Sequence, residues 1–264
     1  MINSKLKIHY IYHSCFAVET PNCFLVFDYY KEPDNNQESN LSKSFVLKDL
    51  ITKQKNVLVF SSHSHHDHFN PAILEWEKYN QNIKYILSSD ITLDSWKANY
   101  FKISQDEELF LKTKLEDAQN IPTSTEMNNE LETVYIKAYG STDIGISFFV
   151  KVDGINIFHA GDLNWWHWKE DSDEERKAAE ENFKAEIDKI KGQPIDIAFF
   201  PVDPRLEEFY GIGAEYFIKE IALKTLIPMH FGDNSYITRE FAEKNSKLPV
   251  KIVTITNPGE ELKI

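Results

Sequence analysis

The sequence predicts an α/β fold in a single domain that spans residues 1–264. Short runs rich in β-branched and aromatic residues recur along the chain, and segments with helix-start signals lie between them. No repeat, low-complexity tract or linker rich in Pro, Gly or Ser divides the sequence. A hydrophobic fraction of 42% over 264 residues can fill a substantial core, so we expect a globular protein.

The first 30 residues predict antiparallel strands. The runs "KIHYIYHSCFAVET" and "CFLVFDYY" are joined by a turn at positions 21–22. Cys15 and Cys23 flank this hairpin, where they could face each other, although two buried thiols in a reducing compartment is the interpretation we favour. The polar segment 31–45 that follows is expected to be a surface loop.

Two segments carry clear helix signals. The Asn-Pro pair at 70–71 supplies an N-cap and a preset first helical residue, so a helix is predicted to begin there. A second helix is predicted at about 173–191, because Ser172 and Glu175 have capping-box spacing and Gly192 can close its end. Its apolar stripe consists of Ala179, Phe183, Ile187 and Ile190, and its many charges are expected to form a solvated face.

Five predicted strands end at an acid or a histidine: "FLVFD" at Asp28, "VLVFSS" at His63, "INIFHAG" at Asp162, "IAFFPVD" at Asp203 and "TLIPMH" at His230. Further strands are expected at "TVYIKAY", "ISFFVKV", "INIFHA", "IDIAFFPV" and "TLIPMH". An unpaired carboxylate at the edge of an apolar layer is costly to desolvate, whereas a divalent cation would satisfy several such groups together. The sequence therefore predicts convergence on metal of Asp28, His63, Asp162, Asp203 and His230.

The stretch "SSHSHHDHFN", residues 61–70, is the densest concentration of metal-binding side chains. His63 and His65 point to the same side of an extended stretch, while Asp67 and His68 come where the chain turns into the predicted helix. Such an arrangement can hold two ions. Imidazole nitrogen with carboxylate oxygen suits zinc, and also iron, manganese or nickel, and the absence of a nearby Cys favours an open catalytic site over a closed structural one.

With these residues the sequence resembles the metallo-β-lactamase-fold hydrolases. Residues 63–68 fit the H-x-H-x-D-H motif of that superfamily. Asp28 comes before them, after an early strand, and Asp162 in "HAGD" and His230 in "IPMH" come after them, in the expected order. The resemblance implies a four-layer αββα sandwich with metals in a cleft at one edge of the two sheets. The segments "IYHSCFAVE", "FHAGDLN" and "LIPMHFGDN" look most like the branch that includes ascorbate-6-phosphate lactonase and phosphodiesterase-like enzymes.

The resemblance also implies a ligand set for one or two Zn²⁺ ions, with Mn²⁺, Fe²⁺ or Ni²⁺ as alternatives. The family usually places a further histidine at about Gly140, where this chain has none. Asp143, His13 or water could complete the first site, or that site is weak or empty. By resemblance, the first metal is bound by His63 and His65, the second by Asp67, His68 and His230, and Asp162 bridges both.

The chemistry that we infer is hydrolysis of a small, anionic ester, lactone or phosphoester by a metal-activated water. Asp67 is expected to orient the water, and His13 or a metal-bound water to protonate the leaving group. Two alternatives stay open: a mononuclear iron dioxygenase on the same fold, and a metal-binding protein whose degenerate site is not catalytic.

Several nearby residues have two interpretations each. Asp28 either caps a turn or accepts a hydrogen bond from a ligand imidazole, and Asp203 either lines the cleft or forms a turn. His159 is expected in the core or behind the ligands, and His66 is expected to point away from its neighbours. At least one tryptophan of "NWWHW" is expected to anchor its loop in the core, and the others could wall the cleft: Trp165, Trp166 and Trp168.

Composition limits the partners of the protein. The formal net charge of −13 repels a polyanion, and no cluster of Lys and Arg offers a footprint for nucleic acid, so we expect a small-molecule substrate and no nucleic acid. No apolar run approaches the roughly 18–20 residues that span a bilayer, and no basic head precedes a long apolar segment. We therefore expect neither export nor membrane insertion, and a cytoplasmic location.

Overall fold

The computed structural model describes residues 6–31, 47–54, 56–113 and 133–264. Within these ranges the strands form two seven-stranded sheets. Apart from its first residue, the surface loop predicted at 31–45 lies outside the described residues.

The first sheet contains the strands that the N-terminal sequence predicts. The first three strands in the chain pair antiparallel, with a turn over residues 20–23, and the next three continue the sheet in parallel. Cys15 and Cys23 are both buried, as predicted. In spatial order the strands are β14 (Glu261–Leu262), β1 (Lys7–Tyr12), β2 (Cys15–Glu19), β3 (Phe24–Phe27), β4 (Val57–Ser61), β5 (Ile83–Ser88) and β6 (Tyr100–Ile103).

The second sheet contains all five strands predicted in the second half of the chain. Four of its strands form an antiparallel meander and the remaining ones pair in parallel. In spatial order the strands are β13 (Lys251–Ile252), β12 (Leu223–Met229), β11 (Ile195–Pro201), β10 (Ile155–His159), β9 (Ser147–Val152), β8 (Thr133–Tyr139) and β7 (Glu108–Lys112).

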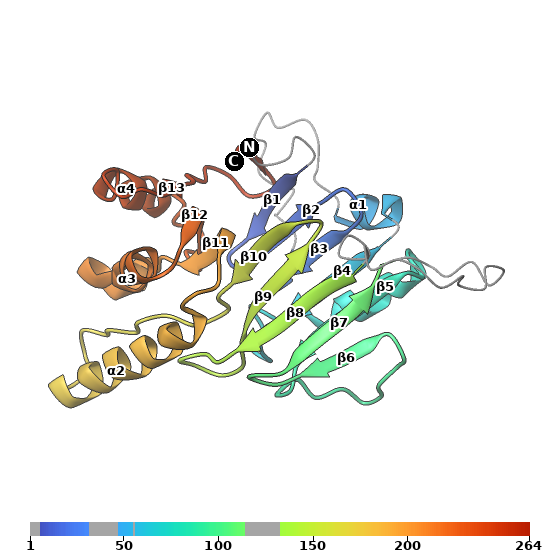
Figure 1. Ribbon diagram of the computed structural model, residues 1–264, viewed down its shortest axis with the longest axis horizontal. Helices are drawn as coiled ribbons and strands as arrows, with labels where there is room; N and C mark the ends of the chain where they lie inside the picture. Colours follow the sequence, from blue (N-terminus) through green and yellow to red (C-terminus); the bar gives the residue numbers. More distant parts are fainter. Residues whose placement is uncertain (1–5, 32–46, 55, 114–132) are drawn as a thin grey trace.

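Alternation of side chains along the strands produces the layers. In β4, Leu58 and Phe60 enter the core between the sheets, whereas Val57 and Val59 face a second core on the other side. That second core is covered by α1 (Leu47–Lys53) and the 3₁₀ helix η1 (Pro71–Lys78). The outer face of the second sheet is covered by α2 (Asp173–Ile190), α3 (Ile212–Glu220) and α4 (Tyr236–Lys244) (Figure 1). The predicted αββα sandwich is confirmed.

Both predicted helix starts are observed. The side chain of Asn70 accepts a hydrogen bond from the backbone N–H of Ala72 at 2.9 Å, although the element that follows is a 3₁₀ helix. At α2, Ser172 and Glu175 form the reciprocal capping box, and Gly192 beyond its end has φ of 84°. Phe183, Ile187 and Ile190 are buried as predicted, whereas Ala179 is only half-buried.

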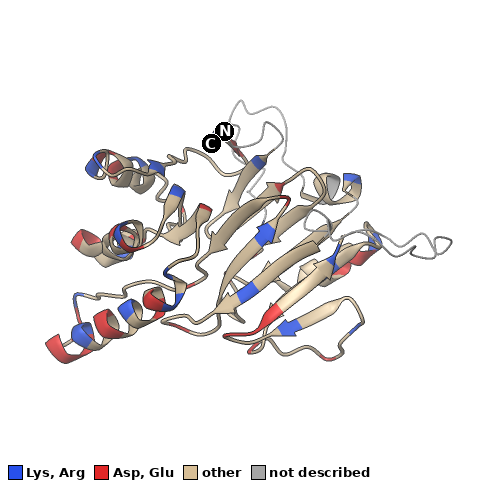
Figure 2. Ribbon diagram, viewed as in Figure 1, with Lys and Arg blue, Asp and Glu red and all other residues tan. Residues whose placement is uncertain are grey.

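The outer helices are polar on their solvent side. Acidic and basic residues alternate along α2 (Figure 2), where Lys177 and Lys184 pair with Glu181 and Glu180 one turn away. These charges form a solvated face, as predicted. In the part of the chain that the structure describes, no helix combines the length and apolar character needed to cross a membrane.

Parallel pairing brings the carboxyl ends of the important strands together. β3 and β4 are parallel neighbours in the first sheet, and β10, β11 and β12 are parallel neighbours in the second. Residues that follow neighbouring parallel strands lie at the same edge of a sheet. Because the sheets pack face to face, the polar residues that end these strands meet at one edge of the sandwich.

We predict that this meeting requires glycine at position 145. Gly145 has φ of 86°, and a Cβ there would lie 2.2 Å from the carbonyl oxygen of Ser62 and 2.4 Å from Cβ of His63. Gly145→Ala should lower the free energy of unfolding by about 3 kcal/mol, from backbone strain and steric overlap together. Gly154→Ala is the matched control, because Gly154 has φ of 76° and open space around it, and should lose only about 1 kcal/mol. Equal losses in chemical denaturation would contradict the close approach.

Candidate metal centre

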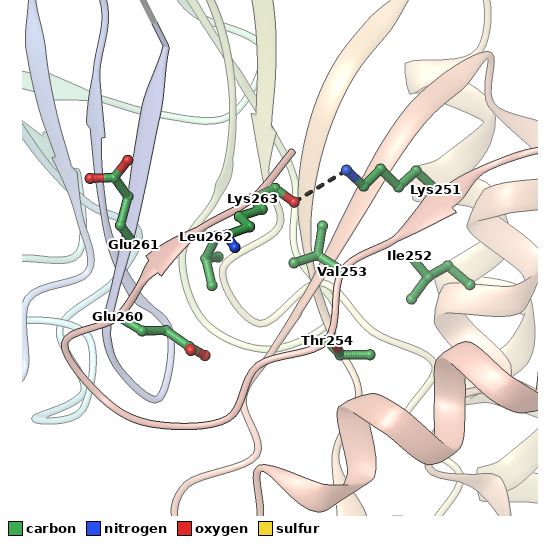
Figure 3. Close-up of a pocket in the computed structure, with 8 residues that line it drawn as sticks. All are labelled: Lys251, Ile252, Val253, Thr254, Glu260, Glu261, Leu262 and Lys263. Carbon is green, nitrogen blue, oxygen red and sulfur yellow. Dashed lines mark hydrogen bonds between the residues drawn. The ribbon is translucent and has the colours of Figure 1, made fainter. Parts of the chain in front are cut away.

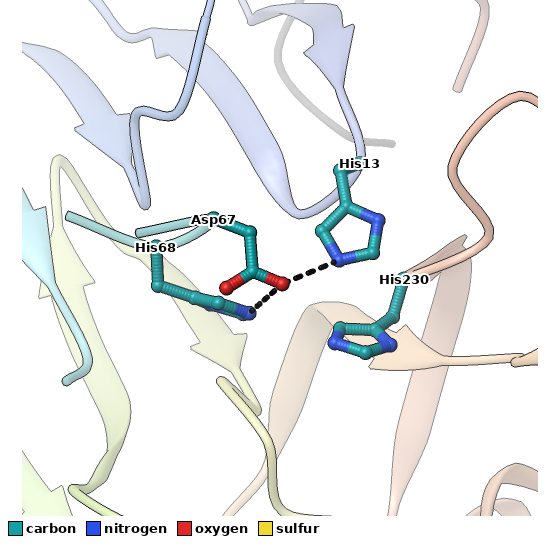
Figure 4. Close-up of side chains that lie close together, drawn as sticks. All are labelled: His13, Asp67, His68 and His230. Atoms are coloured by element: carbon teal, nitrogen blue, oxygen red, sulfur yellow. Dashed lines mark ion pairs between the residues drawn. The ribbon is translucent and has the colours of Figure 1, made fainter. Parts of the chain in front are cut away.

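Histidines and acids from distant parts of the chain meet at the strand ends. His13, Asp67, His68 and His230 point toward one another from the β1–β2 turn, the loop after β4 and the end of β12 (Figure 4). One ligand atom from each lies within 4.8 Å of those of the others. Nε2 of His13 lies 3.5 Å from Oδ2 of Asp67, and Nε2 of His68 lies 3.9 Å from the same oxygen.

A second group lies beside the first. His63, His65 and Asp162 also bring one ligand atom each within 4.8 Å of one another. Nε2 of His63 lies 3.0 Å from Nδ1 of His65 and 3.4 Å from Oδ2 of Asp162. The two-residue spacing of His63 and His65 therefore brings their ring nitrogens close together on one side of the chain, as predicted.

Asp162 lies between the two groups. Its Oδ2 faces His63, whereas its Oδ1 lies 3.1 Å from Nε2 of His68 and 3.2 Å from Nε2 of His230. The structure thus brings together all six predicted ligand residues and adds His13 to them. Their roles as ligands stay predictions.

Asp28 holds His68 in one orientation. Its carboxylate is fully buried, and its Oδ2 accepts a hydrogen bond from Nδ1 of His68 at 2.7 Å. Because the neutral ring donates through Nδ1, its lone pair lies on Nε2, which faces Asp67 and Asp162. Asp28 thus accepts from an imidazole of the centre, as one of the two predicted interpretations had it.

The same carboxylate also orients His63, through Ser62. The Ser62 hydroxyl donates to Oδ2 of Asp28 at 2.7 Å, and its backbone N–H donates to Oδ1 at 2.7 Å. Since the hydroxyl proton is used by Asp28, the hydroxyl oxygen accepts from Nδ1–H of His63 at 3.0 Å. The lone pair of His63 therefore lies on Nε2, facing His65 and Asp162.

Asp203 does for His230 what Asp28 does for His68. Nδ1 of His230 donates to Oδ2 of Asp203 at 3.0 Å, which leaves Nε2 facing Asp162. Asp203 also caps the 3₁₀ helix η3 (Pro204–Phe209) and pairs with the guanidinium of Arg205. Asp203 is therefore a turn former, as one of the two predicted interpretations had it, and with 1% exposure it lies behind His230 rather than lining a cleft.

His13 has the opposite arrangement of protons. Its Nδ1 accepts a hydrogen bond from the backbone N–H of Gly232 at 3.2 Å, so the neutral ring carries its proton on Nε2. This N–H faces Asp67. His68 and His230 thus offer a lone pair to the centre, whereas His13 offers a donor.

The buried atoms of the centre fit a divalent cation. Within the described residues, Nε2 of His68, Nε2 of His230 and Oδ1 of Asp162 are buried without a hydrogen-bond partner. The two nitrogens lie 3.1 and 3.2 Å from that oxygen. Buried polar atoms without partners are costly, and nitrogen and oxygen ligands in this geometry suit Zn²⁺, Fe²⁺ or Mn²⁺. The donor set is therefore that of a metal site.

Electrostatics also distinguishes His13 from His68 when no ion is bound. Burial lowers the pKa of His13 to about 4, so its ring is neutral at neutral pH. Burial opposes the charge of His68 as well, but the carboxylates of Asp162 and Asp28 raise its pKa to about 10. Burial also opposes the charge of Asp67, yet its contacts with His13 and His68 hold its pKa well below the usual range.

Three residues of the centre adopt a left-handed backbone that L-residues rarely use. These are His13 with φ of 56°, Asp28 with φ of 46° and His230 with φ of 66°. The backbone N–H of His230 donates to the carbonyl of His13 at 3.3 Å, so two of these strained positions support each other. Strain of this kind concentrates at functional sites.

The space that a side chain at position 140 would need is occupied by other side chains. A Cβ at Gly140 would lie 2.5 Å from Oε2 of Glu186 and 3.0 Å from Cδ of Gln105, neither of which belongs to the ligand groups. A side chain at 140 would therefore point toward α2 rather than toward His63. His13, one of the three proposed replacements, lies with the second group of ligands, and Asp143 is in neither group.

The remaining predicted residues divide between the core, the surface and the metal centre. His66 is 85% exposed and points away, and His159 is fully buried behind Asp28, with Nε2 donating to the carbonyl of Ser14 at 3.0 Å. Trp165 packs against Phe183 of α2 and anchors its loop in the core. Trp166 instead meets the ring of His230 edge-on at 5.6 Å.

A shallow pocket between β13 and β14 lies apart from the centre (Figure 3). Those strands pair with the beginnings of β12 and β1, whereas His230 and His13 follow the other ends. None of the candidate ligands lines this pocket, which is formed by Lys251, Ile252, Val253, Thr254, Glu260, Glu261, Leu262 and Lys263.

Sequence reasoning missed two residues of the centre. Ser62, which links Asp28 to His63, lies inside the histidine-rich stretch 61–70, but serine is too common at a strand end to be distinctive. Arg205, which binds Asp203, gave no signal beyond its position two residues after that acid.

Comparison with known proteins agrees with this geometry. A family model described as a Beta-lactamase superfamily domain matches residues 7–230. No curated protein matches the sequence.

Solved structures with the same architecture share little sequence with this chain. Igni18, a metallo hydrolase from the archaeon Ignicoccus hospitalis, is 18% identical with a TM-score of 0.59, and the match covers 97% of each chain. YhfI of Bacillus subtilis, a metallo-β-lactamase fold protein, is 14% identical with a TM-score of 0.54 over 97% of this chain and 98% of that one. CmlA, a diiron β-hydroxylase from Streptomyces venezuelae, is 10% identical with a TM-score of 0.58, over 99% of this chain but 55% of that one. These similarities show the fold.

We predict that Asp28→Asn weakens metal binding. The amide keeps the size of the side chain but has one acceptor oxygen, so it cannot accept both from His68 and the Ser62 hydroxyl at one position and from the Ser62 backbone N–H at the other. Affinity for Zn²⁺, measured by competition with a chelating dye, should fall by about 10- to 100-fold. The control is Asp153→Asn, because Asp153 also has positive φ and accepts a backbone N–H, from Asn22 at 2.9 Å. Unchanged affinity in a folded Asp28→Asn protein would contradict the orienting role.

We also predict that metal binding releases protons. Without an ion, the raised pKa of about 10 keeps His68 protonated at pH 7.5, and a bound ion displaces that proton. Calorimetric titration with Zn²⁺ in buffers of different ionisation enthalpy should therefore report release of about one proton or more per protein. The release should decline as the pH rises through 10, where His68 is already neutral. Binding at pH 7.5 without proton release would exclude His68 as a ligand.

Proposed function

Because the chain belongs to the β-lactamase superfamily, we propose that it is a metal-dependent hydrolase of a small anionic ester, lactone or phosphoester. The observation that carries the proposal is the set of buried nitrogen and oxygen atoms that face one another without hydrogen-bond partners. We propose zinc as the native ion. Kinship to the branch that includes ascorbate-6-phosphate lactonase is part of this proposal and has its support in the sequence motifs alone.

The geometry supports one or two bound ions. His63 and His65 would hold one ion, and His68, His230 and Asp67 the other, with one oxygen of Asp162 on each side. When bound, such an ion polarises the bond that is attacked and makes a water molecule acidic enough to attack it.

Asp67 is suited to orient the attacking water. Its side chain is 30% exposed, whereas that of Asp162 is 7% exposed, so Asp67 is the carboxylate of the two groups that water reaches most easily. Its lowered pKa keeps it ionised and able to accept a hydrogen bond. We propose that it accepts from the water whose oxygen attacks the substrate.

His13 is better suited to donate a hydrogen bond than to give up a proton. Its Nδ1 is occupied by the Gly232 N–H, and its pKa of about 4 keeps the ring neutral. A neutral imidazole is a very weak acid, but its Nε2–H can stabilise negative charge that develops on an oxygen. We therefore propose His13 as an oxyanion donor, which leaves water as the source of the leaving-group proton.

An iron-dependent oxygenase is the second candidate function. The ligands contain no sulfur and suit Fe²⁺ as well as Zn²⁺, and the similar fold of CmlA belongs to a diiron hydroxylase. Against it, Asp67 completes the H-x-H-x-D-H pattern that is typical of hydrolases.

The test combines metal analysis with a substrate screen. Protein purified without added metal should contain zinc, and zinc-loaded protein should hydrolyse members of a panel of lactones, carboxylic esters and phosphoesters. Iron content with substrate-dependent O₂ consumption would favour the oxygenase, and metal without turnover would favour a binding protein. Turnover of thioesters alone would contradict the proposed substrate class.

Variants of the cluster sharpen this test. His13→Leu should lower kcat by about 100-fold, and His13→Gln, which retains an N–H donor, by less. Asp67→Asn should abolish turnover. His66→Gln is the control from the same loop, because that side chain is 85% exposed, and it should keep full activity. Equal activity of His13→Leu and His66→Gln would contradict the donor role.

A further inference from the structure

Aromatic side chains extend from His230 along the loop that follows β10. The ring of Trp166 meets His230 edge-on at 5.6 Å between centroids, and it stacks parallel to Trp168 at 5.7 Å. Nε1 of Trp166 donates to the carbonyl of Asp162 at 3.1 Å, so the loop is tied to the backbone of a predicted ligand. Both tryptophans are half-buried. An aromatic surface made of two stacked, half-buried rings therefore begins directly beside the candidate metal centre.

A fixed guanidinium lies at the other end of this surface. The Arg205 guanidinium carbon lies 5.6 Å from the centroid of the Trp168 ring, and its Nη2 lies 3.3 Å from Nδ1 of His230. Asp203 accepts from Nε of Arg205 at 3.0 and 2.9 Å, from Nη2, and from the backbone N–H at 2.9 Å. Arg205 is thus held both by a carboxylate and by an aromatic face.

One edge of this guanidinium remains available. Among the described residues, Nη1 of Arg205 has no hydrogen-bond partner, and the side chain is 59% exposed. Lys169, a cation of the loop that follows β10, is also paired with a carboxylate, that of Glu207 at 2.7 Å. A preorganised guanidinium with free N–H groups is the side chain best suited to bind a carboxylate or a phosphate.

Charge makes this position unusual in the molecule. The chain has a formal net charge of −13, so a small anion is repelled by most of its surface. Hydrogen bonds to Asp203, together with the charges of Asp203, Asp162 and Asp67, raise the pKa of Arg205. The cation therefore lies within electrostatic reach of carboxylates from both ligand groups.

We propose that Arg205, together with Trp166 and Trp168, forms the part of the substrate site that recognises an anionic group next to a flat one. This inference rests on the proposed function and narrows its substrate class. The substrate would carry a carboxylate or phosphate bound by Arg205 and a planar moiety lying on the tryptophans, with its reacting bond directed toward Asp67 and His13. Arg205 then determines specificity, in addition to supporting Asp203.

The test measures binding to the full chain stripped of metal by a chelator, so it needs neither an ion nor turnover. The probes are 2-naphthoate and 2-naphthamide, which share a ring system and differ in charge, and binding is followed by quenching of tryptophan fluorescence. Wild type should bind the carboxylate about tenfold more tightly than the amide or better. Arg205→Gln should lower this preference by about tenfold. Arg205→Lys should retain part of it, because the positive charge remains but the paired N–H donors of the guanidinium are lost.

Two further variants separate recognition from structure. Trp168→Leu should weaken both probes alike, and Arg239→Gln, on α4, should behave as wild type. Arg205→Gln protein that keeps the full preference, or that loses both probes equally, would overturn the inference. Because the binding assay omits metal, its result does not depend on turnover. If zinc-loaded protein hydrolyses nothing in the substrate screen but the Arg205-dependent preference is intact, the proposed function is refuted and the anion site remains.

Discussion

One buried carboxylate orients the imidazoles on which the centre depends. Asp28 accepts from His68 directly and from His63 through Ser62, so a single side chain directs the Nε2 lone pairs of one histidine in each ligand group. Its own burial opposes its charge, yet the neighbouring His159 and His68, the latter also through its hydrogen bond, hold its pKa below the usual range. The arrangement satisfies Asp28 but leaves Nε2 of His68 without a hydrogen-bond partner among the described residues. A divalent cation is the group that completes it.

The rest of the fold serves to bring these atoms together. Parallel pairing of β3 with β4, and of β10 with β11 and β12, delivers the acids and histidines to one edge. Left-handed backbone at His13, Asp28 and His230 turns each chain segment sharply at the end of its strand. Such strain persists only where surrounding packing enforces it, and here two large sheets do so. Stability in the core therefore supports a strained and polar edge.

Much of this could be predicted from the sequence, because strand ends and histidine spacing are local patterns. The α/β class, the capping box of α2 and the gathering of His63, His65, Asp67 and His68 follow from such patterns, whereas the αββα layering is implied by the resemblance to the metallo-β-lactamase-fold hydrolases. The proton arrangement of His13 could not be predicted, since it depends on a hydrogen bond from Gly232, 219 residues away in the chain. The two-residue strands β13 and β14 carry too little pattern to be recognised. Likewise, the direction of residue 140 toward Glu186 is a tertiary fact.

The central claim is that oriented histidines at the strand ends hold a divalent ion. Anomalous X-ray diffraction from crystals of the purified protein, recorded on both sides of the zinc absorption edge, tests it most directly. The account predicts an anomalous peak between Nε2 of His68, Nε2 of His230 and Oδ1 of Asp162, with or without a second peak beside His63. Well-ordered side chains with no transition-metal peak among them, even after soaking with Zn²⁺, would contradict it.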